Sequence, residues 1–174
     1  LCTSNAAVVK WAADYASPFG VFVPGIHGSY YEGANFEKLA FEKMDDYVWL
    51  DQGKFPFPAG RQENVSIRWT GKFNAKSSGK YTFRAACDDG CRLFIDETKV
   101  FEQWGSGGNP QGAIELTPGL HDIKVEYQNI GGGGFLRATW YGANGQEKPQ
   151  QKDCLSAIPA PKPAPAAAPD AEKK

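Results

Sequence analysis

The 174-residue chain lacks a charge excess of either sign, because 19 Lys and Arg offset 20 Asp and Glu to give a net charge of −1. Without a basic field, the sequence argues against binding to nucleic acid or to an anionic membrane. It also lacks any run of about 18 consecutive apolar residues, which is the length that a membrane-spanning helix needs. We therefore expect no membrane insertion.

Helical periodicity is nearly absent, whereas aromatic and turn-forming residues are abundant, with 5 Trp, 7 Tyr, 11 Phe, 20 Gly and 12 Pro. In the clearest run, Val65, Ile67 and Trp69 alternate with polar residues, as in a half-buried strand. Short alternating runs separated by turns indicate an all-β protein, a β-sandwich or barrel with long loops. The stretch 32–60 is expected to be a loop, since it contains two prolines near its end. The expected strands are 25–31, 65–73, 81–85, 92–96, 114–116, 121–128 and 135–141.

Four cysteines allow three disulfide pairings. We favour Cys87–Cys91, which would brace a short turn, and Cys2–Cys154, which would tie the two ends of the domain together. Closing so long a loop would stabilise the fold by about 2–5 kcal/mol. Disulfides would place the protein in an oxidising compartment.

Other uses of the cysteines stay open. Zinc normally needs tighter ligand spacing than these cysteines offer, and only His27 and His121 are available to assist them. Free thiols are a further alternative. Leu1-Cys2 also fits the remnant of a lipoprotein signal, in which the cysteine would be acylated.

The most informative stretch is Cys87-Asp88-Asp89-Gly90-Cys91, which lies between two strand-like runs. Adjacent carboxylates repel each other, so a rigid turn that gathers them needs either a cation or a solvated face. Their hard oxygen atoms suit calcium. The alternative is an ordinary hairpin turn, because Asp-Gly is itself a strong hairpin signal.

The composition changes abruptly after residue 156, where Pro, Ala and Lys replace core-forming residues. We interpret 1–156 as one domain and 157–174 as a disordered Pro/Ala-rich linker with semi-rigid polyproline character. A linker of this kind would hold the domain away from a second domain or a cell surface, although a recombinant end is an alternative.

Several further motifs occur in an order that resembles the PA14 domain, a β-sandwich module of bacterial toxins, glycosidases and microbial adhesins. The resemblance spans about 25–141 and includes a glycine–aromatic opening, a strand ending in Arg-Trp-Thr-Gly and an Asp-Asp-Gly hairpin. It implies a β-sandwich of the PA14 type. The matching segments are 25–36, 64–71, 79–83, 88–96, 118–127 and 136–140.

The adhesin branch of this family, typified by yeast flocculins, binds calcium through two aspartates joined by a cis peptide. The resemblance assigns these roles to Asp88 and Asp89, and the asparagine of a second loop to Asn129. Backbone carbonyls would come from Gly131 and Gly133. Sugar hydroxyls would then bind the ion directly, at coordination positions that the protein leaves open. In many PA14 domains another residue occupies the position of Asn129, so this residue favours the adhesin branch.

Other aromatic and polar residues are candidates for ligand contact. Trp104 would stack on a sugar ring beside Gln103, or else pack within the protein, since a tryptophan recurs at this family position. Trp69 and Trp140 lie on expected strands and are assigned to the core. The sequence does not decide the role of Trp49.

The pair Asp45-Asp46 is interpreted as a solvated loop rather than a second metal site. We do not expect an enzyme, because Asp88 and Asp89 share one loop and cannot flank a glycosidic bond across about 5–9.5 Å. No nucleophile with a partner base is evident in the sequence either.

The sequence therefore predicts a calcium-dependent carbohydrate-binding domain, a lectin or adhesin, that is secreted or displayed on a cell surface. Its partners would be cell-surface glycans or polysaccharides, and it would form part of a larger multidomain protein. The alternatives are a non-lectin PA14 module that serves structure or protein contact, and an accessory domain of a glycosidase.

Overall fold

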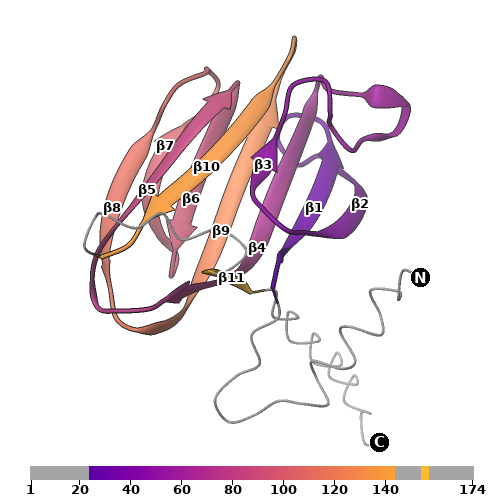
Figure 1. Ribbon diagram of the computed structural model, residues 1–174. Coiled ribbons are helices and arrows are strands. Elements are labelled where there is room, and N and C mark those ends of the chain that lie inside the picture. The colour runs from indigo at the N-terminus through magenta and orange to yellow at the C-terminus, as the bar shows by residue number, and fades with distance from the viewer. Residues whose placement is uncertain (1–23, 144–153, 157–174) are drawn as a thin grey trace, which may run out of the picture.

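A computed structural model describes residues 24–143 and 154–156, and these form two antiparallel β-sheets packed face to face (Figure 1). The expected β-sandwich is confirmed. The Pro/Ala-rich segment 157–174 and Cys2 lie outside the described residues. Within the described ranges, no helix combines the length and the apolar composition that crossing a bilayer requires.

Sheet A contains seven strands in the order β2-β1-β4-β9-β6-β7, with β11 also paired to β4. Sheet B contains four strands in the order β3-β10-β5-β8, and a 3-10 turn, η1, precedes β4. The bounds are β1 Ile26–Glu32, β2 Lys38–Asp45, β3 Trp49–Leu50, η1 Pro58–Gly60, β4 Val65–Ala75, β5 Gly79–Asp88, β6 Gly90–Ile95, β7 Thr98–Gln103, β8 Gln111–Leu116, β9 Gly119–Asn129, β10 Phe135–Tyr141 and β11 Leu155–Ser156.

The core lies between the two sheets and is rich in aromatic side chains. Trp69 and Trp140 are almost fully buried, as predicted. Phe73 of sheet A meets Phe83 and Trp140 of sheet B edge to face, with ring centroids 5.2 and 5.7 Å apart. Aromatic pairs in this geometry add roughly 0.5–1.5 kcal/mol each beyond the burial of their surface. The apolar residues of the alternating pattern read from the sequence are thus those that point into the core.

The expectation of a loop over 32–60 was wrong, because the segment contains β2, β3 and η1. Strand β2 lies at the edge of sheet A, where half of its residues are exposed and none is fully buried. An edge strand that buries little apolar surface has no need of a period-2 pattern, so the sequence carries no signal for it.

The Asp88-Asp89 turn does not close a hairpin. Strand β5 pairs with β10 and β8 in sheet B, whereas β6 pairs with β9 and β7 in sheet A. The chain therefore crosses from one sheet to the other at these two aspartates. Local turn residues indicate a change of direction, but they do not say whether the next strand pairs with the previous one.

Asp45 is not a solvated loop residue, which corrects its interpretation. It ends β2, and its carboxylate accepts hydrogen bonds from Tyr30 Oη at 2.5 Å and from Trp69 Nε1 at 2.9 Å. Lys43 pairs with the same carboxylate. Burial of the phenol, and then the negative charge of Asp45, raise the pKa of Tyr30. Asp45 thus connects the edge strand to the core, whereas the neighbouring Asp46 is exposed.

We predict that Asp45→Ala lowers the free energy of unfolding by about 1–3 kcal/mol, because it leaves the Trp69 N–H and the Tyr30 hydroxyl without an acceptor. Urea denaturation followed by tryptophan fluorescence measures the change. Asp46→Ala is the matched control and should shift the stability by less than about 0.5 kcal/mol. Equal stability of the two variants would contradict the role assigned to Asp45.

Candidate metal site

Four connections between strands meet at one end of the sandwich, at the top of Figure 1. They are the β5–β6 turn at 88–89, the β9–β10 loop at 130–134, the β7–β8 loop at 104–110 and the β3–β4 connection at 51–64. Strand register brings them together, because Asp88 pairs with Phe135 and Asn129 pairs with Val65. The predicted metal ligands of both loops therefore lie at the same end of the molecule.

Asp89 is bonded to the backbone of the β9–β10 loop. Its Oδ2 accepts hydrogen bonds from the N–H groups of Ile130 at 2.7 Å and Gly131 at 3.2 Å. Its own N–H donates to the carbonyl of Gln128 at 3.2 Å. Hydrogen bonds to a carboxylate are stronger than those between neutral groups, so Asp89 fixes where this loop begins.

Asp88 is held on two sides. Tyr127 Oη donates to its carbonyl at 2.5 Å, and the Asp88–Asp89 peptide bond is cis, as the resemblance implies. The neighbouring Cys87 exchanges two backbone hydrogen bonds with Gly108, at 3.0 and 2.9 Å. A Cβ atom at Gly107 would lie only 2.9 Å from Asp88 Oδ1, so the β7–β8 loop packs directly against this carboxylate.

The two aspartates place two carboxylates side by side in the sequence at this turn. Burial, followed by the charge of Asp89, raises the pKa of the Asp88 carboxyl above its usual range. In the described part of the chain, no Lys or Arg forms an ion pair with Asp88 or Asp89. A carboxyl group perturbed by a like charge is a signature of functional sites, because a bound cation would relieve the repulsion.

Asn129 presents a buried oxygen that lacks a partner. Its Nδ2 donates to the carbonyls of Gln62 at 2.6 Å and Gly132 at 3.2 Å, which fixes the orientation of the amide. The opposite atom, Oδ1, is buried and has no hydrogen-bond donor among the described residues. Burying an amide oxygen without a donor costs roughly 1–3 kcal/mol. An acceptor held in this way is suited to a hard cation.

The glycines of the β9–β10 loop serve different purposes. A Cβ atom at Gly134 would overlap the Tyr127 hydroxyl and lie 2.7 Å from Asn129 Cγ, so this position requires glycine. Gly131 is bonded through its N–H to Asp89 and otherwise faces open space. Gly133 lies against the side chain of Gln52. Metal binding by the carbonyls of Gly131 and Gly133 stays a prediction.

Glu63 borders the site and was missed by sequence reasoning. Its Oε1 accepts a hydrogen bond from the N–H of Gly132 at 3.1 Å. Three successive amides, those of Ile130, Gly131 and Gly132, are therefore each held by a carboxylate. No local signal marks Glu63, because only the pairing of β4 with β9 brings it here.

The residues present fit calcium better than zinc. The set consists of two carboxylates, the unpaired amide oxygen of Asn129 and nearby backbone carbonyls, all of them oxygen atoms. Among the described residues, no group of three or more His, Cys, Asp and Glu is placed to hold a metal. A tetrahedral nitrogen and sulfur site of the zinc type thus has no counterpart at this end of the fold.

Cys87 and Cys91 bracket the Asp88-Asp89 turn, as predicted, and both are buried. Their Sγ atoms lie 2.8 Å apart, with the Cys91 thiol donating to Cys87. This contact lowers the pKa of Cys87 and raises that of Cys91. The structure holds them as thiols, so a disulfide between them stays a prediction. Cys154 is buried, and its predicted partner Cys2 lies outside the described residues.

Trp104 lies at the rim of the site but makes contacts within the protein. Its ring stacks on Phe36 with centroids 6.1 Å apart, and the Arg92 guanidinium lies 4.2 Å from its ring centroid. The buried Glu126 binds Arg92 through an ion pair, which fixes this arrangement. The contacts indicate a packing role for Trp104, which was the alternative to sugar stacking.

Gln103 is also engaged within the β7–β8 loop. Its Nε2 donates to Ser106 Oγ at 2.7 Å, and its side chain packs on the backbone of Gly108. Gln103 therefore shapes the loop that lies against Asp88, and direct contact with a ligand stays a prediction.

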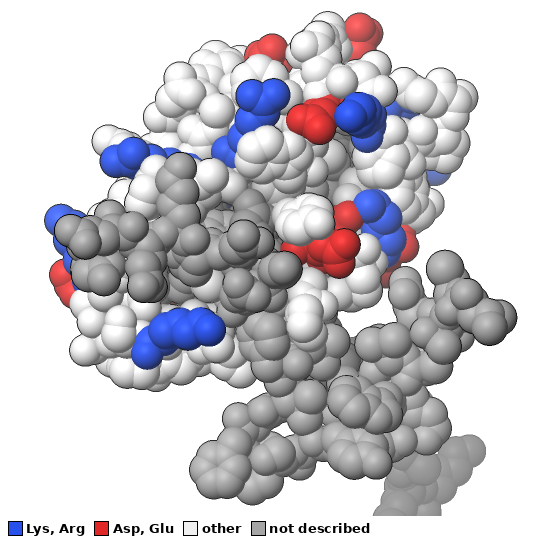
Figure 2. All heavy atoms as spheres, viewed as in Figure 1, with Lys and Arg blue, Asp and Glu red and all other residues white. Residues whose placement is uncertain are grey.

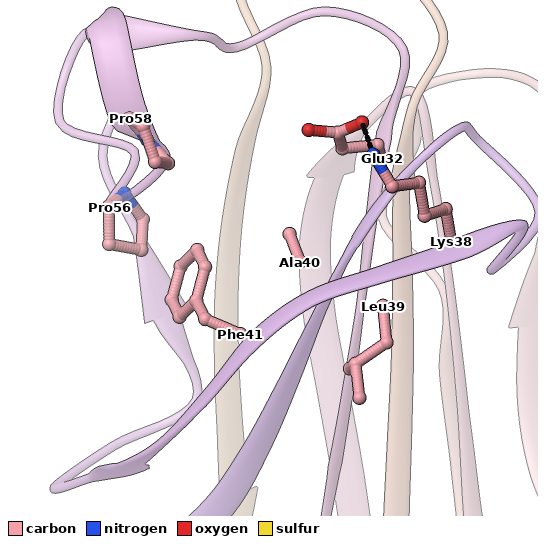
Figure 3. A pocket seen from close by; sticks show the side chains of 7 residues that line it. All are labelled: Glu32, Lys38, Leu39, Ala40, Phe41, Pro56 and Pro58. Carbon is pink, nitrogen blue, oxygen red and sulfur yellow. Dashed lines mark hydrogen bonds and ion pairs between the residues drawn. The ribbon is translucent and has the colours of Figure 1, made fainter.

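A concave feature of the surface lies away from the predicted site residues. A shallow depression of about 420 Å³ opens between β2 and the segment before η1. Figure 3 shows Phe41, Pro56 and Pro58 on one side and the Glu32–Lys38 ion pair, 3.1 Å long, on the other. Its single carboxylate is already paired, so the depression offers no comparable cation site.

Comparison with known proteins places this geometry in context. The model of the PA14 domain family matches residues 23–153. A curated relative, anti-sigma-I factor RsgI3 of Acetivibrio thermocellus, is 32% identical over 124 residues, which cover 68% of this chain and 19% of that protein. The chain thus spans about a fifth of the length of this relative.

Solved structures of two kinds share the fold. An anti-sigma factor domain-containing protein from Clostridium clariflavum is 30% identical with a TM-score of 0.69, covering 83% of this chain and 50% of that one. A PA14 sugar-binding domain from an RTX adhesin has a TM-score of 0.64 at 18% identity, covering 78% of this chain and 99% of that one. At that identity the second match shows the fold alone.

We predict that Cys87 and Cys91 form a disulfide when the protein is purified in air without reductant. Their sulfur atoms are already in contact, and both side chains are buried. Alkylation under denaturing conditions, followed by peptide mass spectrometry, would find both residues protected and linked. Pre-treatment with a reductant is the control. Full alkylation of both residues in the untreated protein would show instead that they remain thiols.

Proposed function

This chain belongs to the PA14 domain family, and we propose that it binds calcium and, through calcium, the hydroxyl groups of a glycan. The observation that carries the proposal is the unpaired buried oxygen of Asn129, the residue just before Ile130, whose N–H donates to the Asp89 carboxylate. A cation would satisfy that oxygen and offset the repulsion between the two aspartates at the same time.

The contacts of each residue indicate what it would contribute to calcium binding. Asp88 and Asp89 would supply the negative charge, and Asn129 a neutral oxygen whose direction is fixed by Gln62 and Gly132. Bound calcium would supply open coordination positions that a pair of sugar hydroxyls can fill in place of water. Tyr127 and the β9–β10 loop hold the metal ligands in place before the ion binds, which lowers the entropy lost on binding.

The proposal extends to biological context. Part of the family resemblance is to adhesins, and a sugar-binding PA14 domain shares this fold. We therefore propose a secreted or cell-surface location and glycans of cells or polysaccharides as partners. Single open sites of this kind bind weakly, so several copies or domains would act together.

A second candidate function is a PA14 module that contacts protein in a regulatory chain. The observation that favours it is the 30–32% identity to two proteins named as anti-sigma factors, which exceeds the identity to the adhesin domain. Such a module needs no calcium. Calcium titration therefore separates the two candidates.

We predict that chelator-stripped protein binds calcium saturably in calorimetry, and that Asp89→Asn lowers the affinity by more than about a hundredfold. Changes to residues that only orient metal ligands already cost roughly 10- to 100-fold. Asparagine keeps an acceptor for the Ile130 and Gly131 amides, so the loop keeps its hydrogen bonds while the charge is lost. Asp46→Ala, which removes an exposed carboxylate elsewhere, should bind as the wild type does. Unchanged affinity in Asp89→Asn would refute the site.

We also predict that calcium affinity falls on acidification at a pH above the ordinary Asp value of about 3.9. Burial and the charge of Asp89 raise the pKa of Asp88, so its protonated form appears at a higher pH than for a free aspartate. Calcium must displace that proton, and binding therefore weakens as the pH falls toward the raised pKa. Titrations between neutral and mildly acidic pH measure the effect. An affinity independent of pH down to about 4 would contradict it.

A further inference from the structure

An exposed tryptophan lies on the outer face of sheet B, close to the aspartate turn. Trp49 keeps 43% of its surface exposed, and Tyr47, two residues earlier, keeps 54%. The residues between and after them, Val48 and Leu50, are buried, so the segment presents its aromatic rings outward by the period-2 rule. Single exposed apolar residues are common, but two exposed aromatic rings only two residues apart are not explained by core packing.

The Trp49 ring is held in a fixed orientation. Its Nε1 donates to Asp51 Oδ1 at 3.0 Å, and the Arg137 guanidinium lies 5.6 Å from its ring centroid. Arg137 in turn lies 5.5 Å from the centroid of Phe135 and 3.9 Å from Asp51. An exposed aromatic side chain normally samples several rotamers, and fixing it in advance reduces the entropy lost when a ligand stacks on it.

Strand register connects this tryptophan to the metal site. Trp49 pairs with Arg137 on β10, and Phe135, two residues back on the same strand, pairs with Asp88 on β5. Phe135 and Arg137 alternate with the buried Leu136, so they share the outer face. Two strand spacings across and two residues along the strand place the Trp49 and Asp88 backbones about 12 Å apart.

The face between these two points includes a small side chain. It is that of Ala86, the neighbour of Arg137 on β5. Figure 2, viewed as Figure 1 with β10 and β5 in front, shows separate blue and red groups rather than one field of a single sign. Recognition here would therefore depend on shape and stacking more than on charge steering.

We propose that Trp49 is a stacking platform for a second sugar ring of the glycan whose first ring is bound at Asp88 and Asp89. The inference rests on the proposed function and adds a specificity-determining residue to it. A single ring cannot occupy both positions, whereas an oligosaccharide can lie along the face of β10. The apolar C–H face of a pyranose suits the exposed indole, and the Asp51 and Arg137 side chains provide hydrogen-bonding groups at its edge.

The test compares mono-, di-, tri- and tetrasaccharides of glucose, mannose, galactose and xylose in calorimetry with calcium present. In the wild type, affinity should rise with chain length. In Trp49→Ala, calcium and monosaccharide affinity should be unchanged, while tri- and tetrasaccharide binding falls about three- to tenfold. Trp49→Phe keeps a ring and should retain most of the gain. Leu39→Ala removes a comparably exposed apolar side chain on sheet A, 50% against 43%, and should change nothing.

Each outcome decides between the claims. If affinity still rises with oligosaccharide length in Trp49→Ala, Trp49 is not a stacking platform, and the proposed calcium site is unaffected. Absence of any gain in the wild type for all four sugars would also overturn the stacking platform. A third outcome is that no calcium binds, but tetrasaccharides still quench a tryptophan fluorescence signal that Trp49→Ala abolishes. This result would support stacking of a sugar on Trp49 and refute the calcium-dependent function. If Trp49→Ala changes only self-association in sedimentation, the face is a protein contact and the inference is wrong.

Discussion

Two like charges at the point where the chain passes from one sheet to the other set the main physical constraint on this domain. Asp88 and Asp89 cannot move apart, because β5 and β6 are each fixed in a different sheet. Their repulsion is only partly offset by the amides that bind Asp89. The surrounding contacts, from the two touching cysteine thiols to the β9–β10 loop, keep this unfavourable arrangement in one place. A cation is the natural complement to it.

The parts of the fold that were read correctly from the sequence are those that bury one face. The alternation around Trp69 records the inward side of β4, and turn residues marked most strand ends. Strand β2 was not predicted, because an exposed edge strand does not require an alternating pattern of apolar and polar residues. The crossing at Asp88 was mistaken for a hairpin, since pairing is decided by contacts far away in the sequence. Family resemblance, rather than local pattern, identified Asn129, and the unpaired oxygen was visible only in three dimensions.

Long-range contacts also explain two residues that sequence reading missed or misassigned. Glu63 borders the metal site and Asp45 lies near the other end of sheet A, yet each is an acceptor for groups that strand pairing brings to it. The same fold serves proteins named for sugar binding and for anti-sigma activity. Function within one fold therefore has to be argued from the site residues of each chain rather than from the architecture.

The β9–β10 loop contains glycines that packing requires and one glycine position that is free to change. Gly134 lies against Tyr127 and Asn129 and allows no side chain, and Gly132 has a positive φ of 76° that disfavours one. Gly131 is different, because it has an ordinary backbone conformation and open space around it. A side chain installed there would project into open space, from a residue whose N–H is bonded to Asp89, without disturbing the core. This single position therefore offers a route to redesigning selectivity, by natural divergence or in the laboratory, at little cost in stability.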